Sequence, residues 1–256
     1  MSSLWYPSVK QAPMSMGGMG GVVASYNFRS AGGGGGLVGE DYSVDFDGND
    51  FLSVPANSAY HIGSGDYTVE LWMYKDSDGE LISAFEQPSP WTGWLMGTNF
   101  GASSKLAFYI MNQAGNSHVT MHSTNTVAYQ QWQHLAVSKS SNTWRFFLDG
   151  TLDATHTSTI DPGDSGENIM IGADKNYPTL YRAFDGKISN VRITKGQCLY
   201  TSSFTPSTSP LGTLTQGATG SNVKLLCCNQ SSVTGSVVTT GTITTVGDPT
   251  SADGPF

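Results

Sequence analysis

The feature that most constrains the fold is the alternation in DYTVELWMYK, residues 66–75. One face of this stretch carries side chains that suit a protein core, namely Tyr67, Val69, Leu71 and Met73. The other face carries Thr68, Glu70, Trp72 and Tyr74. A period of two places successive side chains on opposite faces of an extended chain. The stretch therefore predicts a β-strand that covers a core with one face.

Short strand-like stretches recur through most of the chain, at 105–111, 134–139, 143–150 and 168–174. The second and third of these form a predicted hairpin with a Ser-Ser-Asn turn, and Asp149-Gly150 marks the following turn. No segment shows a convincing period of 3.6 residues, so helices should be few. We therefore predict an all-β fold, a two-layer antiparallel β-sandwich or jelly roll.

Composition divides the chain into three parts. Residues 1–39 are rich in Gly and Met, with five consecutive glycines at 32–36, and such a stretch buries too little apolar surface to order itself. We expect it to be an extended arm that docks on a neighbouring subunit, the alternative being a fold-back onto its own domain. Residues 40–212 should form the sandwich. Residues 213–256 offer one extra strand at 223–228 and an extended Thr/Gly-rich tail, which could also pair as an edge strand.

The bulk chemistry excludes several functions. The net charge is −8 and only 12% of residues are charged, which argues against nucleic acid as a partner because phosphate binding needs clustered Lys and Arg. No apolar run is long enough to span a membrane, and the N-terminus lacks the pattern of a secretory signal. The three cysteines, Cys198, Cys227 and Cys228, fit neither a disulfide framework nor a zinc motif. We expect them to be small apolar residues in or near strands.

Four blocks in this order resemble the concanavalin A-like, laminin-G-type jelly-roll family: SVDFDGNDFLSVPA (43–56), GDYTVELWMY (65–74), WQHLAVSKSSNTWRFFLDGTL (132–152) and the pair NIMIGAD…FDGKISNVRIT. Together they cover roughly residues 40–212. The spacing of Ile188 and Val191 within the last block breaks strict alternation, so a β-bulge is expected near Ser189-Asn190.

A narrower resemblance concerns ITKGQCLYTSSFTPSTSPL followed by KLLCCNQSS. This ending looks like that of laminin-G-type domains in virion proteins of tailed phages, marine phages in particular, where the Thr/Pro-rich half is the exit from the domain. The resemblance implies a virion structural or appendage protein, such as a fibre, knob or capsid decoration. Its partners would be other virion proteins and copies of itself, and it would leave the cell by lysis.

Catalysis is not expected from the carboxylate pattern. The fold's retaining glucanases carry an E-x-D-x-E strand, which lines carboxylates on one face for nucleophilic and acid/base work. No carboxylate lies two residues from Glu70, and although Asp66 lies four residues before it, the E-x-D-x-E spacing is absent. We therefore predict a non-enzymatic protein.

A structural Ca²⁺ ion is a further implication of the family, since several relatives bind one through a carboxylate of the closing strand and carbonyls near the opening strand. Ser189 and Asn190 stand at those carboxylate positions and offer only neutral oxygens, which weakens the expectation. The remaining candidates are acidic residues of the two Asp-Gly stretches: Asp45, Asp47, Asp50 and Asp185. The alternative is that these residues simply form turns.

Glycan binding is the common activity of this fold outside catalysis, and it needs exposed aromatic faces with neutral hydrogen-bonding groups. Two loops offer such residues: Trp91, Trp94 and Asn99 in the first, and Asn176, Tyr177, Tyr181 and Arg182 in the second. Trp72, Trp132 and Trp144 lie in predicted strands and are expected in the core. The sequence thus favours a virion component that adheres to surfaces, with a lectin-like module for host polysaccharide as the alternative.

Overall fold

A computed structural model describes residues 36–86, 91–102, 104–112, 117–176 and 179–256 of the chain. The predicted arm lies outside the described residues except for its last four. Of these, Val38 forms a β-bridge with Gly212, and the N–H of Gly39 donates to the carbonyl of Leu211 at 3.0 Å.

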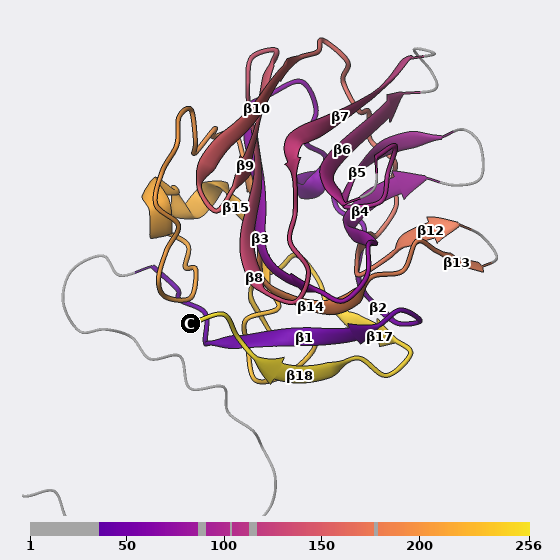
Figure 1. Cartoon of the computed structure of the whole chain (residues 1–256), viewed down its shortest axis with the longest axis vertical. Coiled ribbons are helices and arrows are strands. Elements are labelled where there is room, and N and C mark those ends of the chain that lie inside the picture. Colours follow the sequence, from indigo (N-terminus) through magenta and orange to yellow (C-terminus); the bar gives the residue numbers. More distant parts are fainter. Residues whose placement is uncertain (1–35, 87–90, 103, 113–116, 177–178) are drawn as a thin grey trace, which may run out of the picture. The chain divides into compact units, whose positions relative to one another are not determined.

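Two antiparallel sheets form a sandwich, as the alternation and the family resemblance predict (Figure 1). The nine-stranded sheet contains β1 (Tyr42–Asp47), β3 (Tyr67–Lys75), β8 (Trp132–Ser140), β9 (Thr143–Leu148), β10 (Thr151–Thr157), β14 (Asp185–Lys195), β15 (Val223–Cys227), β16 (Ser236–Val238) and β18 (Thr250–Asp253). Its main path runs β10-β9-β8-β3-β14-β1-β18, and β15 and β16 continue from β14.

The seven-stranded sheet has the order β17-β2-β11-β4-β5-β6-β7. Its strands are β2 (Phe51–Val54), β4 (Glu80–Glu86), β5 (Thr92–Gly97), β6 (Lys105–Asn112), β7 (Ser117–Thr126), β11 (Ile169–Ile171) and β17 (Thr244–Val246). A small hairpin, β12 (Asp174–Asn176) and β13 (Thr179–Tyr181), stands apart. The helices of the described residues are single 3₁₀ turns, η1 (Ser58–Tyr60), η2 (Thr215–Gly217) and η3 (Gly220–Asn222), and none is long and apolar enough to cross a membrane.

The core lies between the sheets and contains the predicted inner face of β3, whose four apolar side chains are fully buried. Trp144 is buried with them and packs edge-on against Tyr67. Trp72 and Trp132 are only partly buried, on the outer face of the nine-stranded sheet. The expectation that they belong to the core is therefore wrong, because alternation points them away from it.

The predicted hairpins are confirmed. β8 and β9 pair from Leu135↔Leu148 to Ser140↔Thr143 around a two-residue turn. Asp149 and Gly150 both have positive φ, 48° and 73°, as a type I′ turn requires, and this turn joins β9 to β10. The predicted bulge is also present, since the β14–β3 register shifts between Ser189 and Arg192.

The C-terminal residues do not form the expected tail. β15 is the predicted extra strand, but β16, β17 and β18 also pair, so the edge-strand alternative is the correct one. β17 borders the seven-stranded sheet and β18 the nine-stranded sheet. Residues 213–256 therefore belong to the sandwich itself, and the described chain is one compact unit.

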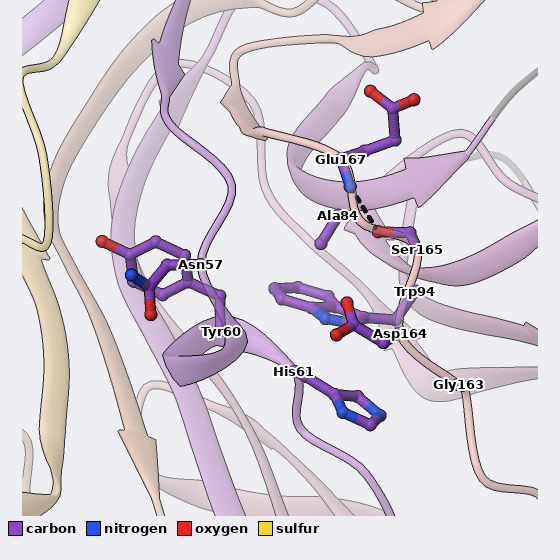
Figure 2. A pocket seen from close by; sticks show the side chains of 9 residues that line it. All are labelled: Asn57, Tyr60, His61, Ala84, Trp94, Gly163, Asp164, Ser165 and Glu167. Atoms are coloured by element: carbon purple, nitrogen blue, oxygen red, sulfur yellow. Dashed lines mark hydrogen bonds between the residues drawn. The ribbon is translucent and has the colours of Figure 1, made fainter.

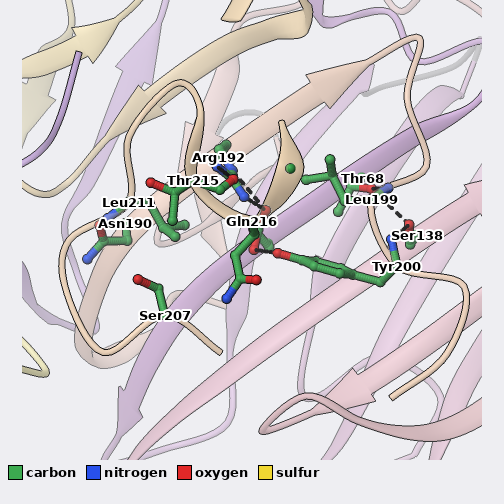
Figure 3. Close-up of polar contacts among 12 residues, drawn as sticks. Thr68, Ser138, Asn190, Arg192, Leu199, Tyr200, Ser207, Leu211, Thr215 and Gln216 are labelled. Carbon is green, nitrogen blue, oxygen red and sulfur yellow. Dashed lines mark hydrogen bonds and ion pairs between the residues drawn. The ribbon is translucent and has the colours of Figure 1, made fainter. Parts of the chain in front are cut away.

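The Ser/Thr/Pro-rich residues 197–216, named the covering segment from here on, do not leave the domain. They fold back over the outer face of the nine-stranded sheet, where Tyr200 packs on Phe147 and Leu199 donates its N–H to Thr68. Figure 3 shows Leu199 and Tyr200 beside Thr68 and Ser138, where the N–H of Tyr200 donates to the Ser138 hydroxyl. The expectation that this segment leaves the domain is wrong, because its residues pack on the outward face of β3 and β8.

Candidate functional site

An open groove of about 420 Å³ lies on the outer face of the nine-stranded sheet. It is lined by Trp72, Asp149, Thr205, Pro206, Ser207, Thr208, Pro255 and Phe256. β3, the β9–β10 turn, the covering segment and the residues after β18 thus each supply part of one surface. The volume lies within the range of small-molecule binding sites.

Two aromatic side chains form the apolar part of the groove. The rings of Trp72 and Phe256 meet edge to face, with centroids 5.4 Å apart and an interplanar angle of 80°. Trp72 also packs edge-on against His134 of the neighbouring strand β8. The indole nitrogen of Trp72 is buried and has no hydrogen-bond partner among the described residues. A ligand would therefore meet the carbon surface of the ring.

Polar groups stand around these rings. Asp149 is exposed, and its two carboxylate oxygens accept from the backbone N–H of His134 at 2.9 Å and from Nε2 of Gln133 at 3.0 Å. The hydroxyls of Thr205 and Thr208 make no hydrogen bond to another described residue, and both threonines are exposed. The groove thus offers apolar faces beside groups that bind hydroxyls.

A buried ion-pair cluster beneath the covering segment holds this side of the sheet together. Glu70 accepts from Arg192 Nη2 at 2.6 Å, from the Tyr200 hydroxyl at 2.7 Å and from His134 Nε2 at 3.1 Å. Burial disfavours the charged carboxylate, but Arg192, His134 and Tyr200 outweigh it and lower the pKa of Glu70 to about 2. Glu70 is therefore ionised at neutral pH.

The same cluster positions the wall of the groove. Arg192 Nη1 donates to the carbonyls of Gly212 and Thr215, both at 2.9 Å. Figure 3 shows Arg192 beside Thr215. The Tyr200 ring stacks on Phe204 with centroids 3.6 Å apart. The N–H of Phe204 donates to Gly150 at 2.8 Å. The chain that follows Phe204 is thereby fixed beside Trp72.

The two loops predicted to bind glycans are only partly suited to that role. Trp91 is 47% exposed, as expected, just before β5. Trp94 is 1% exposed and stacks on Phe108 inside the sandwich, so the expected sugar contact there is wrong. Trp94 is buried because the alternation of side chains along β5 directs it into the sandwich.

The second loop lies on the outside of the seven-stranded sheet. The Arg182 guanidinium lies over the Phe100 ring, 4.3 Å from its centroid. Asn99, the residue before Phe100, is partly buried. Asn176 and Tyr181 belong to the β12–β13 hairpin, and their side chains, like all of Tyr177, lie outside the described residues.

A second, much smaller cavity adjoins Trp94. Figure 2 shows Tyr60, His61, Asp164 and Glu167 among the side chains around it. Its volume of about 10 Å³ holds roughly one water molecule. It is too small for a sugar.

The carboxylates that could hold a cation differ from the predicted set. Asp47, Asp50 and Asp248 have ligand atoms within 4.8 Å of one another, and carboxylates are the oxygen donors that Ca²⁺ prefers. Asp185 lies opposite Asp47 in the β1–β14 register, adding a fourth acidic residue nearby. Asp248 was not predicted because it follows β17, nearly two hundred residues away in the sequence.

The other two predicted ligands lie elsewhere. Asp45 pairs with Lys187, with Oδ2 3.7 Å from Nζ. Asn190 is buried, and its Oδ1 accepts from the N–H of Leu211 at 2.7 Å. It therefore fastens the end of the covering segment, and the expectation that it joins an acidic cation site is wrong.

Asp50 should make stability depend on pH. It is 1% exposed, and burial together with Asp47 and Asp248 raises its pKa to about 6 from an ordinary 3.8. A raised acid pKa means that the folded state binds the proton more tightly, so stability falls as pH rises from about 4 to 6. Asp50→Asn keeps the acceptor for the Asp47 N–H and removes the charge.

In EDTA at pH 8, Asp50→Asn should therefore raise the free energy of unfolding by about 1 kcal/mol, with little effect at pH 3.5. Thermal melts at both pH values measure this. A lower melting temperature of the variant at pH 8 in EDTA would contradict the prediction. Adding CaCl₂ provides the cation test, because a bound ion would stabilise the wild type and not the variant.

The sequence did not single out the groove residues. One signal was present: Trp72 occupies the polar face of an alternating strand, where a large aromatic residue is unusual. The remaining residues come from distant segments that only folding brings together.

The two packed antiparallel sheets define a jelly-roll domain of the concanavalin A-like kind. The family model described as the concanavalin A-like lectin/glucanases superfamily, laminin-G type, matches residues 46–198. The chain belongs to this superfamily. No curated protein matches the sequence.

Solved structures share the fold at low sequence identity. A native heptameric SAP-like pentraxin from Limulus polyphemus superposes with a TM-score of 0.53 and 11% identity, covering 84% of this chain and 96% of the pentraxin. A putative carbohydrate-binding protein from Bacteroides ovatus gives a TM-score of 0.50 and 15% identity, covering 85% of this chain and 61% of that protein. These likenesses support the fold.

Proposed function

We propose that this protein is a non-enzymatic glycan-binding domain and that the groove beside Trp72 is its binding site. The observation that carries the proposal is the pairing of the Trp72 and Phe256 rings with the exposed hydroxyls of Thr205 and Thr208. Sugar rings present C–H faces that pack on aromatic rings and hydroxyls that bind neutral polar groups. The putative carbohydrate-binding protein of the same fold supports this function by analogy.

Binding without hydrolysis agrees with the carboxylates at the site. Glycoside hydrolysis ordinarily uses two carboxyl groups that flank the scissile bond. Asp149 carries the one side-chain carboxyl group among the residues that line the groove. Glu70 lies beneath the surface, fully buried and paired with Arg192. We therefore propose that laminarin-like glucans release no reducing sugar with this protein.

Trp72→Ala should reduce glycan affinity by about fivefold or more, because stacking of a planar base on an aromatic side chain contributes about 1–3 kcal/mol and a sugar face packs on the ring in a similar way. A glycan array followed by calorimetry on the strongest binder measures this. Trp132→Ala is the matched control, since Trp132 is a partly buried tryptophan on the same sheet face outside the groove.

Equal losses in the two variants, or no glycan binding by the wild type, would refute the groove as a lectin site. A third variant, Trp91→Ala, tests the predicted loop. Loss of binding in that variant alone would move the site to the seven-stranded sheet.

We further propose that a phage virion carries this domain, with the arm contacting other virion proteins or a second copy. The resemblance of residues 193–211 to phage virion domains and the low share of charged residues, 12%, support this. Antibodies against the protein should label particles purified by density gradient in electron micrographs. Finding the protein only in the particle-free fraction of the lysate would contradict this role.

A further inference from the structure

We infer that the groove selects uncharged glycans and rejects anionic ones such as sialylated, uronic-acid or sulfated sugars. This inference rests on the proposed glycan-binding function and specifies its ligand class. The charge of the groove carries it.

Asp149 is the one ionisable side chain among the eight residues that line the groove. Its carboxylate oxygens accept hydrogen bonds from uncharged donors, the His134 backbone and the Gln133 amide. Its exposed carboxylate is thus a negative group at the groove, and neither of these two donors is a cation.

A second carboxylate lies close by. Asp41 Oδ1 accepts a hydrogen bond from the backbone N–H of Phe256 at 3.2 Å. A second negative group therefore lies close to one of the two aromatic residues of the groove. The protein as a whole has a net charge of −8. Both the local and the overall charge therefore repel anions.

No cation compensates within the lining, as far as the described residues extend. Arg192 is the buried cation of this side of the sheet, and it is paired with Glu70 at 2.6 Å. Its Nη1 is also bound to the carbonyls of Gly212 and Thr215. Recognition of a carboxylate or sulfate needs an available guanidinium, ammonium or cluster of N–H groups, and the groove supplies none in its described lining.

The same groups favour a neutral sugar. Trp72, Phe256, Pro206 and Pro255 offer apolar surface to a sugar face. Asp149 can accept a sugar hydroxyl in a hydrogen bond that its charge strengthens. One carboxylate thus attracts uncharged hydroxyls and repels acidic substituents.

The test uses the full chain and paired probes: lactose with 3′-sialyllactose, and neutral galactan and glucan oligosaccharides with their sulfated forms. The neutral member of each bound pair should bind about fivefold or more tightly at low salt. The difference should shrink in 1 M NaCl, where the screening length is about 3 Å.

Asp149→Asn is the decisive variant. An Asn-Gly pair retains the type I′ turn, and the Asn oxygen can still accept the His134 N–H. The variant should narrow the preference for neutral sugars to about twofold or less. Circular dichroism melts verify that it is folded, and the salt series on the wild type is an independent measurement if it is not.

The outcomes separate the two proposals. Trp72-dependent binding of acidic sugars at equal or higher affinity would overturn the selectivity and leave the lectin function standing. A neutral preference that neither salt nor Asp149→Asn changes would also overturn it. Binding of no probe from either set would overturn the proposed function, and the selectivity with it.

Discussion

Replacing Glu70 by alanine should lower the free energy of unfolding at pH 7 by about 3–5 kcal/mol, the usual cost of breaking a buried ion pair. Glu70, Arg192 and the Tyr200 hydroxyl are buried together. The variant leaves the Arg192 guanidinium without its counter-ion in a site that water does not reach. Urea denaturation followed by tryptophan fluorescence measures the loss.

The loss should depend on pH in a defined direction. The folded-state pKa of Glu70 is about 2, below its ordinary 4.5. An acid whose pKa is lower in the folded state than in the unfolded state stabilises the fold above pH 4.5, and this stabilisation is lost as the pH falls toward 2. The difference between wild type and Glu70→Ala should therefore narrow at pH 3.

A double variant, Glu70→Leu with Arg192→Met, provides the control for the charge. It removes both ions and replaces them with apolar side chains, which is often far less costly than removing one. We expect it to be more stable than Glu70→Ala, although the carbonyls of Gly212 and Thr215 lose their donor. A double variant as unstable as Glu70→Ala would show that packing rather than the unpaired charge sets the cost.

The second large effect is expected at Gly150. Its φ is 73°, and a Cβ atom there would lie 2.1 Å from the carbonyl oxygen of Phe204 and 2.8 Å from Cδ of Pro206. Gly150→Ala therefore strains the turn and pushes the covering segment off the sheet, costing about 2–4 kcal/mol in total. Because Pro206 lines the groove, the variant should also weaken glycan binding.

Gly166 provides a control for the backbone conformation alone. Its φ is 66°, and nothing lies within 4 Å of a Cβ atom built there. Gly166→Ala should cost about 1 kcal/mol, the strain of a left-handed alanine. Thermal melts and calorimetry compare the two variants. Equal stability losses would mean that the close approach of Phe204 to Gly150 does not fasten the covering segment.

Local sequence patterns predicted much of the sandwich. The alternation in β3 placed Tyr67, Val69, Leu71 and Met73 in the core, and Asp149-Gly150 marked a turn, because side-chain direction and turn conformation depend on neighbouring residues. Trp72 lies on the outward face of the same strand, where the period of two excludes it from the core.

Other predictions required information that no local pattern contains. The resemblance to phage virion domains suggested that the Thr/Pro-rich half of residues 193–211 leaves the domain, but it folds back because Tyr200 completes the hydrogen bonds of a buried Glu70. The Thr/Gly-rich C-terminus was expected to be mainly extended, yet β17 and β18 pair at the sheet edges. An edge strand has backbone N–H and C=O groups without hydrogen-bond partners, and these two strands supply them.

The sequence by itself therefore determined the strands of the four family blocks, the turns beside them, the family and the low content of charged residues. Only the tertiary structure decided which residues line the groove proposed as the binding surface. Trp72, Asp149, Pro206 and Phe256 lie in four separate parts of the chain. Two causes bring them together. The inner face of β3 packs in the core, so Trp72 points to the outer face of the sheet, and the buried ion pair of Glu70 and Arg192 fixes the covering segment over that outer face.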